Sequence, residues 1–96
     1  MSKSYVGQRT IDGIVVTVDG NLLDERTDIK RFTDYGFEWS YEGTSPQQLA
    51  LAILADCLGD KDEALKQSEA FMKSVIANLD NDWVLSSEEV AEALGK

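Results

Sequence analysis

The chain has 96 residues, of which 43% are hydrophobic and 28% are charged, as in an ordinary globular domain. We expect a single domain over residues 1–96, because this length supports one modest core. Nine basic and eighteen acidic residues give a net charge of −9, which disfavours direct binding to nucleic acid or to an anionic membrane. The absence of histidine removes the commonest general base and a usual zinc ligand.

The sequence also favours a reducing, cytoplasmic location. The first residues lack the apolar core of a signal peptide, and no apolar run approaches the roughly 18 residues of a membrane span. Cys57 is the only cysteine, so it cannot form an internal disulfide.

The first part of the chain predicts a small antiparallel sheet. Three β-rich runs, residues 5–11, 14–18 and 21–23, are separated by Asp-Gly pairs at 12–13 and 19–20. Asp-Gly readily adopts the positive φ angles of a tight hairpin turn, so the pattern indicates a three-stranded meander. The central run is apolar at nearly every position, and we expect it to be well covered.

A fourth strand, or at least an extended segment, is expected at residues 37–41, after a loop over residues 24–36. Phe37, Trp39 and Tyr41 alternate with polar residues, which is the period of a half-buried strand. We expect these aromatic side chains to face the core. The alternative is an exposed aromatic patch that binds another protein.

The second part predicts about three helices. The first follows Ser45 as N-cap and Gln48 as its capping-box partner, and it ends at Gly59. It is apolar nearly all round, which is typical of a buried central helix. The second begins near Asp60 and ends at about Leu79.

The second helix carries one apolar stripe, with Phe71 at its edge. A third, short helix spans Ser87 to about Leu94. Strands followed by helices favour an α+β fold. We therefore predict a small antiparallel sheet of three to four strands in the N-terminal half, packed against about three C-terminal helices. The expected stripe of the second helix comprises Leu65, Met72, Val75, Ile76 and Leu79.

The connection before the third helix resembles a calcium-binding loop, because acidic and polar residues fall at its ligand spacing. Trp83, however, stands where such a loop requires glycine. Ser86 as N-cap and Glu89 as its partner explain the same residues as a capping box, which is the interpretation we favour. The residues at ligand spacing are Asn78, Asp80, Asp82, Ser86 and Glu89.

No other pattern predicts chemistry. Cys57 lies in an apolar helix and is expected to be a small core residue. The many carboxylates fall at helix starts and on polar faces, where solvation explains them. We predict no catalytic residue, no metal site and no cofactor.

One set of residues forms a recognisable pattern along the chain: Tyr5, Gly7, Arg9, Phe37, Trp39, Tyr41, Gly43, Pro46 and Trp83. In this pattern the chain resembles a family of small proteins known as domain of unknown function 6166, which occurs in bacteria, archaea, phages and plasmids. Ser40 and Glu42 depart from it, because many members have glycine at these positions. The resemblance covers nearly the whole chain and implies a shared fold, but no activity.

Charge and resemblance together suggest a non-enzymatic protein-interaction module, with a phage or mobile element as a candidate origin. Its acidic surface is expected to bind a basic protein surface, for example on a protein that handles nucleic acid. The alternatives are a self-associating structural subunit and, less favoured, a calcium-binding protein or an enzyme. The simplest interpretation of the acidity itself is that it keeps a small protein soluble. The expected binding residues are Glu38, Glu42, Asp60, Asp62, Glu63, Glu88 and Glu92.

Overall fold

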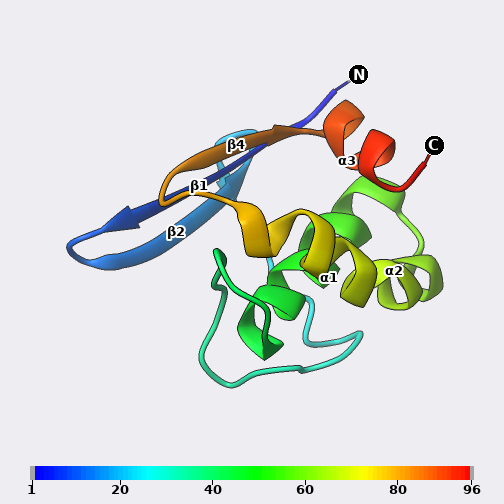
Figure 1. Ribbon diagram of the computed structural model, residues 1–96, viewed down its shortest axis with the longest axis horizontal. Coiled ribbons are helices and arrows are strands. Elements are labelled where there is room, and N and C mark those ends of the chain that lie inside the picture. The colour runs from blue at the N-terminus through cyan, green and yellow to red at the C-terminus, as the bar shows by residue number, and fades with distance from the viewer. Residues whose placement is uncertain (1, 96) are drawn as a thin grey trace.

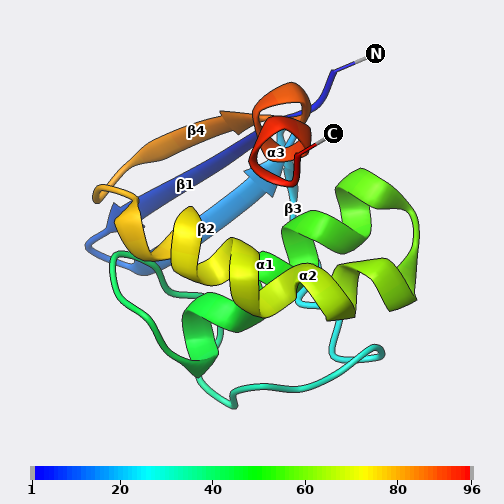
Figure 2. The ribbon, with the colours of Figure 1, turned by 45° about the vertical axis from the view of Figure 1, so that its right-hand side comes forward.

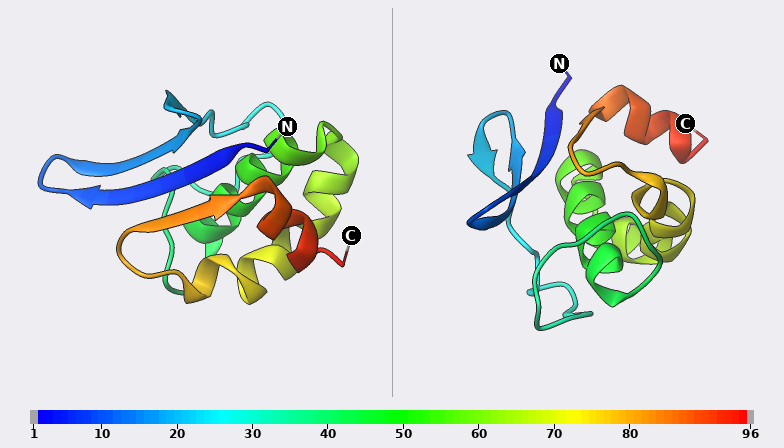
Figure 3. Two further views of the ribbon diagram at one scale, coloured as in Figure 1. Left: turned by 90° about the horizontal axis from the view of Figure 1, so that it is seen from above. Right: turned by 60° about the vertical axis from the view of Figure 1, so that its left-hand side comes forward.

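A computed structural model describes residues 2–95 and confirms the α+β fold. Its four strands form one antiparallel sheet in the order β3-β2-β1-β4, and the helices pack on one face of that sheet (Figure 1). The β1–β2 hairpin extends beyond the helices (Figure 3). The elements are β1 (Ser4–Thr10), β2 (Gly13–Val18), β3 (Asn21–Leu22), α1 (Thr44–Leu58), α2 (Lys61–Ser74), the 3₁₀ turn η1 (Ile76–Asn78), β4 (Trp83–Ser86) and α3 (Ser87–Ala93).

The sheet has one covered and one uncovered face. Gly7 lies opposite Val16 on β2 and opposite Trp83 on β4, and all three are buried. The alternate positions point away from the helices, so Val84 is 63% exposed. The prediction that β2 is well covered is therefore wrong, because Val16 is its only buried residue.

The apolar helix α1 lies at the centre of the fold, as its sequence predicts. It lies close to the sheet on one side and to α2 on the other (Figure 2). Leu49, Leu51, Ile53 and Leu54 are all fully buried. Burying each of these side chains contributes about 1.5–3 kcal/mol, which makes this helix the main apolar contribution to the core.

The fourth strand is β4, not residues 37–41. Gly36 and Ser40 have positive φ angles of 81° and 79°, and such angles interrupt an extended ladder. The Ser40 N–H donates to the Ile76 carbonyl at 3.1 Å, so this segment joins the helical layer instead of the sheet. Of its aromatic side chains only Trp39 is buried, and Tyr41 is 50% exposed.

The predicted cap of α1 is also wrong. The helix follows Gly43, and no side chain caps it. The Ser45 and Gln48 side chains, which a capping box would need, form tertiary contacts instead. The Ser45 hydroxyl lies 2.9 Å from the Thr33 hydroxyl, and the buried Gln48 side chain bonds to the preceding loop.

The second helix ends earlier than predicted, at Ser74. Val75 leaves the helical region at φ −120°, and the Asn78 side chain then donates to the Ser74 carbonyl at 3.1 Å. The start of α2 agrees with the prediction, and Asp60 caps the helix by accepting from the Glu63 N–H. Phe71, expected at the edge of the apolar stripe, is fully in the core at 1% exposure.

The capping box before α3 is confirmed. The Ser86 hydroxyl accepts from the Glu89 N–H at 3.1 Å, and the Glu89 carboxylate accepts from the Ser86 N–H at 2.9 Å. Asp82 instead accepts from the Arg9 N–H. Four of the five residues at calcium-ligand spacing, Asn78, Asp82, Ser86 and Glu89, thus make separate structural contacts. Residues 2–95 contain no cluster of three metal-binding side chains. Within the same range, no helix combines the length and apolarity needed to cross a membrane.

The close approach of β4 to β1 depends on a glycine. The Trp83 ring lies against the Gly7 main chain, in the space that any larger side chain would occupy. It also meets Trp39 edge to face, with ring centroids 5.5 Å apart. Neither indole N–H has a hydrogen-bond partner among the described residues, so this contact stabilises the fold through packing.

We predict that Gly7→Ala lowers the free energy of unfolding by about 1–3 kcal/mol, because the new methyl group would overlap the Trp83 ring. Urea unfolding followed by tryptophan fluorescence measures the change. Gln8→Ala is the matched control on the exposed face of the same strand, with an expected effect within about 0.5 kcal/mol. Equal stabilities of the two variants would contradict this packing.

Candidate functional site

An open groove of about 590 Å³ lies between the start of β2 and the loop that precedes α1. One wall comes from the β1–β2 hairpin and the other from residues 35–41. This is the size of a small-molecule site or of a pocket for a few side chains. Its lining comprises Gly13, Ile14, Glu25, Tyr35, Gly36, Phe37, Glu38, Tyr41 and Ser45.

The groove combines exposed aromatic rings with carboxylates and lacks a basic lining residue. Tyr35 is 92% exposed and Tyr41 is 50% exposed, although tyrosine rings are costly to leave in water. Glu25 and Glu38 provide the two acidic groups of the lining. Aromatic faces and carboxylates both attract cations, so the groove is suited to a guanidinium or ammonium group.

A single buried side chain holds the loop that forms the outer wall. Gln48 of α1 is fully buried, and its Oε1 accepts from the Phe32 N–H at 2.7 Å. Its Nε2 donates to the carbonyls of Glu25 at 2.7 Å and Lys30 at 3.0 Å. Gln48 thus satisfies three main-chain groups of a loop that has no ladder of its own, and it fixes the main chain of Glu25 at the groove.

A second contact positions Tyr35. The Thr33 hydroxyl is buried, lies 2.9 Å from the Ser45 hydroxyl, and accepts from the Tyr35 N–H at 3.1 Å. The start of α1 therefore fixes the main chain of Tyr35, while the ring points into solvent. An ordered main chain beneath an exposed ring reduces the entropy lost when that ring binds a partner.

Arg9 connects the hairpin to the other wall of the groove. Its guanidinium donates to the Glu38 carboxylate at 2.7 Å, to the Trp39 carbonyl at 3.1 Å and to the Asn81 side chain at 3.2 Å. It also lies 4.6 Å from the centre of the Trp39 ring. One side chain therefore links β1, the loop and the turn before β4, and it holds Glu38 at the groove.

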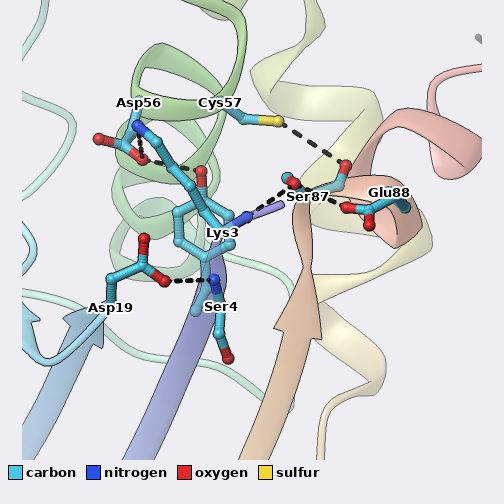
Figure 4. Close-up of polar contacts among 8 residues, drawn as sticks. Lys3, Ser4, Asp19, Asp56, Cys57, Ser87 and Glu88 are labelled. Carbon is cyan, nitrogen blue, oxygen red and sulfur yellow. Dashed lines mark hydrogen bonds and ion pairs between the residues drawn. The ribbon is translucent and has the colours of Figure 1, made fainter. Parts of the chain in front are cut away.

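A different polar cluster joins the start of β1 to the C-terminal end of α1 (Figure 4). The Tyr5 hydroxyl donates to Asp56 at 2.8 Å, and the Lys3 ammonium contacts the same carboxylate oxygen at 3.2 Å. Cys57 lies 3.8 Å from the Ser87 carbonyl. These groups satisfy one another and do not line the groove, so the cluster explains how the strand is fixed to the helix.

The protonation of this cluster agrees with a structural role. Burial, reinforced by Asp56, raises the pKa of Tyr5, so its hydroxyl stays protonated as a donor. Burial also raises the pKa of the Cys57 thiol, which opposes the thiolate form needed for reactivity. The expectation that Cys57 lies in the core holds in part, since the residue is only half-buried.

The structure does not bring the seven predicted acidic residues together. Glu38 lines the groove, and Glu42 is exposed next to Tyr41. Four of the others belong to the starts of α2 and α3, and Glu92 lies near the C-terminal end of α3. These parts of the two helices are on the side of the molecule away from the hairpin tip (Figure 1). The Ser87 hydroxyl donates to Glu88, which lowers the pKa of that carboxyl. The residues on this side are Asp60, Asp62, Glu63, Glu88 and Glu92.

Sequence reasoning missed Ile14, Glu25 and Tyr35 as groove residues. No periodic pattern includes Glu25 or Tyr35, because both lie in an irregular loop that tertiary contacts shape. A weak signal was present at Tyr35, since a large aromatic next to glycine marks a turn that can present a side chain to solvent. The alternative that residues 37–41 form an exposed patch agrees with the exposed Tyr41. It does not agree with Trp39, which is buried.

Four of the nine residues that carry the family resemblance meet at the junction of hairpin, loop and β4. Gly7, Arg9, Trp39 and Trp83 contact one another there. The sequence profile of a family of unknown function (DUF6166) matches residues 5–96. The chain belongs to this family. Comparison of this DUF6166 protein with curated proteins and with solved structures found no match in either group.

We predict that Arg9→Lys destabilises this DUF6166 protein by about 1–2 kcal/mol. Lysine keeps the charge, but it cannot reach three acceptors with one planar group. Arg31→Lys is the matched control, because Arg31 forms one exposed ion pair with Asp34. Equal unfolding midpoints for Arg9→Lys and the native protein would contradict the linking role of Arg9.

Proposed function

We propose that this protein is a non-enzymatic interaction module that binds a basic segment of a partner protein in its acidic, aromatic groove. The observation that carries the proposal is the placement of two exposed tyrosines, Tyr35 and Tyr41, beside the carboxylates of Glu25 and Glu38. Exposed aromatic residues in a groove mark interaction sites more often than single surface apolar residues do.

The chemistry of the groove favours arginine or lysine as the bound side chain. Glu25 forms no ion pair among the described residues, so its carboxylate is available to a cation. The Oε1 of Glu38 already accepts from Arg9, and its Oε2 has no hydrogen-bond partner among the described residues. A cation over the ring of Tyr35 or Tyr41 adds about 0.5–1 kcal/mol at an exposed site.

The net charge of −9 favours a protein partner over nucleic acid. A negative field attracts a positively charged protein, including one whose basic surface handles nucleic acid, and it accelerates the encounter. A cytoplasmic location, which the single cysteine supports, and an origin in a phage or mobile element are further parts of this proposal.

Self-association is the second candidate function, and the uncovered face of the sheet favours it. Leu22 is 79% exposed and Val84 is 63% exposed on that face. The strand positions there carry no ionisable side chain, so two acidic molecules could meet without direct charge repulsion. A dimer mass in light scattering that Val84→Lys converts to a monomer mass would favour this candidate.

We predict that Glu25→Gln and Tyr35→Ala each weaken binding of a short arginine-rich peptide by about threefold to tenfold. The first removes a charge pair and the second a cation–π contact. Fluorescence anisotropy with a labelled peptide measures the affinity, and the difference between native protein and Glu25→Gln should shrink in high salt.

Asp62→Asn is the matched control for Glu25→Gln. It changes the net charge by the same amount, but Asp62 is an exposed residue of the first turn of α2, outside the groove. We expect it to weaken binding by less than about twofold, because screening reduces its influence at that distance. Equal losses for Asp62→Asn and Glu25→Gln would show a diffuse charge effect and contradict binding in the groove.

A further inference from the structure

The edge of β2 is only partly covered by β3. β3 has two residues, and Val18 lies opposite its first residue, Asn21. The Val16 carbonyl accepts from the Leu23 N–H at 3.0 Å, and the chain then leaves the sheet. The first residues of β2 therefore have a strand partner on the β1 side only.

The alternation of a strand determines which main-chain groups face this open edge. The groups of Val16 and Val18 point toward β3, so those of Ile14, two residues earlier, point to the same edge. None of the described residues pairs with them there. An edge strand with a free N–H and C=O is a template for an added strand.

This open edge forms a wall of the acidic groove. Gly13 and Ile14 line the groove opposite Tyr35, Glu38 and Tyr41. A side chain built at Gly13 would meet no atom within 4 Å, so an approaching chain has space there. The unpaired main-chain groups of Ile14 and the side chains that can bind a cation therefore face the same groove.

The other edge of the sheet does not offer the same opportunity. In β4, the groups of Trp83 and Leu85 pair with β1, so those of Val84 and Ser86 face outward. The Ser86 N–H, however, donates to the Glu89 carboxylate at 2.9 Å as part of the capping box. Of these two residues only Val84 remains free at that edge, and it does not line the acidic groove.

We propose that the partner binds as an extended basic segment that adds a short antiparallel strand to the edge of β2 at Ile14. The inference rests on the proposed function and specifies how the groove is used. Main-chain hydrogen bonds to Ile14 fix the segment, and an arginine or lysine side chain reaches Glu25 and Glu38 beside the tyrosine rings.

The geometry also predicts which partner residues pair. Ile14 lies opposite Arg9, on the face of the sheet that carries the helices and the groove. A residue directly opposite Ile14 on an added strand shares that face. The basic residue in the groove is therefore also the residue whose own N–H and C=O bond to Ile14.

A synthetic peptide of alternating arginine and valine tests this arrangement. N-methylation of the arginine main-chain nitrogens removes the donors that face β2 and adds a clash, so we expect affinity to fall by about tenfold or more. The matched control is the same peptide with its valine nitrogens methylated, which should bind within about threefold of the unmodified peptide. Peptide binding should also slow hydrogen exchange of the Ile14 amide but leave that of Val15, which faces β1, unchanged.

The outcomes separate this inference from the proposed function. Equal affinities of the two methylated peptides, with unchanged Ile14 exchange, would overturn strand addition. If Glu25→Gln still weakened binding in that case, the groove function would stand. Failure of the unmodified peptide to bind at low salt would instead overturn the proposed function, and this inference with it.

Discussion

The arrangement of the molecule depends on the three-way contact of one arginine. Arg9 bonds to Glu38, to the Trp39 carbonyl and to Asn81, and its guanidinium lies against the Trp39 ring. These partners belong to segments far apart in the sequence. Arginine suits this position because its planar fork donates in several directions at once. Without it, the hairpin, the loop and the turn before β4 would share packing contacts but lack this common hydrogen-bonded centre.

The same contact explains how the groove can hold several carboxylates although the chain has few cations to balance their charge. Arg9 compensates the charge of Glu38 from behind, while Gln48 fixes the loop from the helical side without adding charge. The exposed side of the groove therefore keeps its carboxylates and its tyrosine rings. Of the other predicted acidic residues, Asp60 caps α2, and Asp62, Glu63 and Glu88 lie in the first turns of α2 and α3, where the helix dipole favours negative charge.

Local sequence signals predicted those parts of the fold that local physics determines. The Asp19-Gly20 turn, the central apolar helix and the Ser86–Glu89 capping box depend on neighbouring residues, and the structure confirms them. The first turn is shifted by one residue to Ile11 and Asp12, because Gly13 already pairs with Thr10 as the start of β2. The fourth strand did not follow from local pattern. Residues 37–41 alternate like a strand, but positive φ angles and a bond to Ile76 draw them to the helices, and β4 occupies the edge of β1.

The groove was less predictable, because its walls come from an irregular loop and a strand edge. Glu38 was predicted from charge alone, whereas Glu25 and Tyr35 reach the groove only through the bonds of Gln48 and Thr33. Such long-range contacts leave no periodic signal in a single sequence. β3 ends before it reaches Ile14 and so leaves the main-chain groups of Ile14 unpaired. Tertiary contacts likewise determine where β3 ends.

The most direct test of the proposed binding groove is chemical-shift mapping of the isotope-labelled protein during titration with an arginine-rich peptide. Binding in the groove predicts that the amide shifts concentrate at residues 13–14 and 35–41, with saturation and with little change at the starts of α2 and α3. Shifts that concentrate at Asp60, Asp62 and Glu88, or that spread weakly over the whole acidic surface, would contradict it.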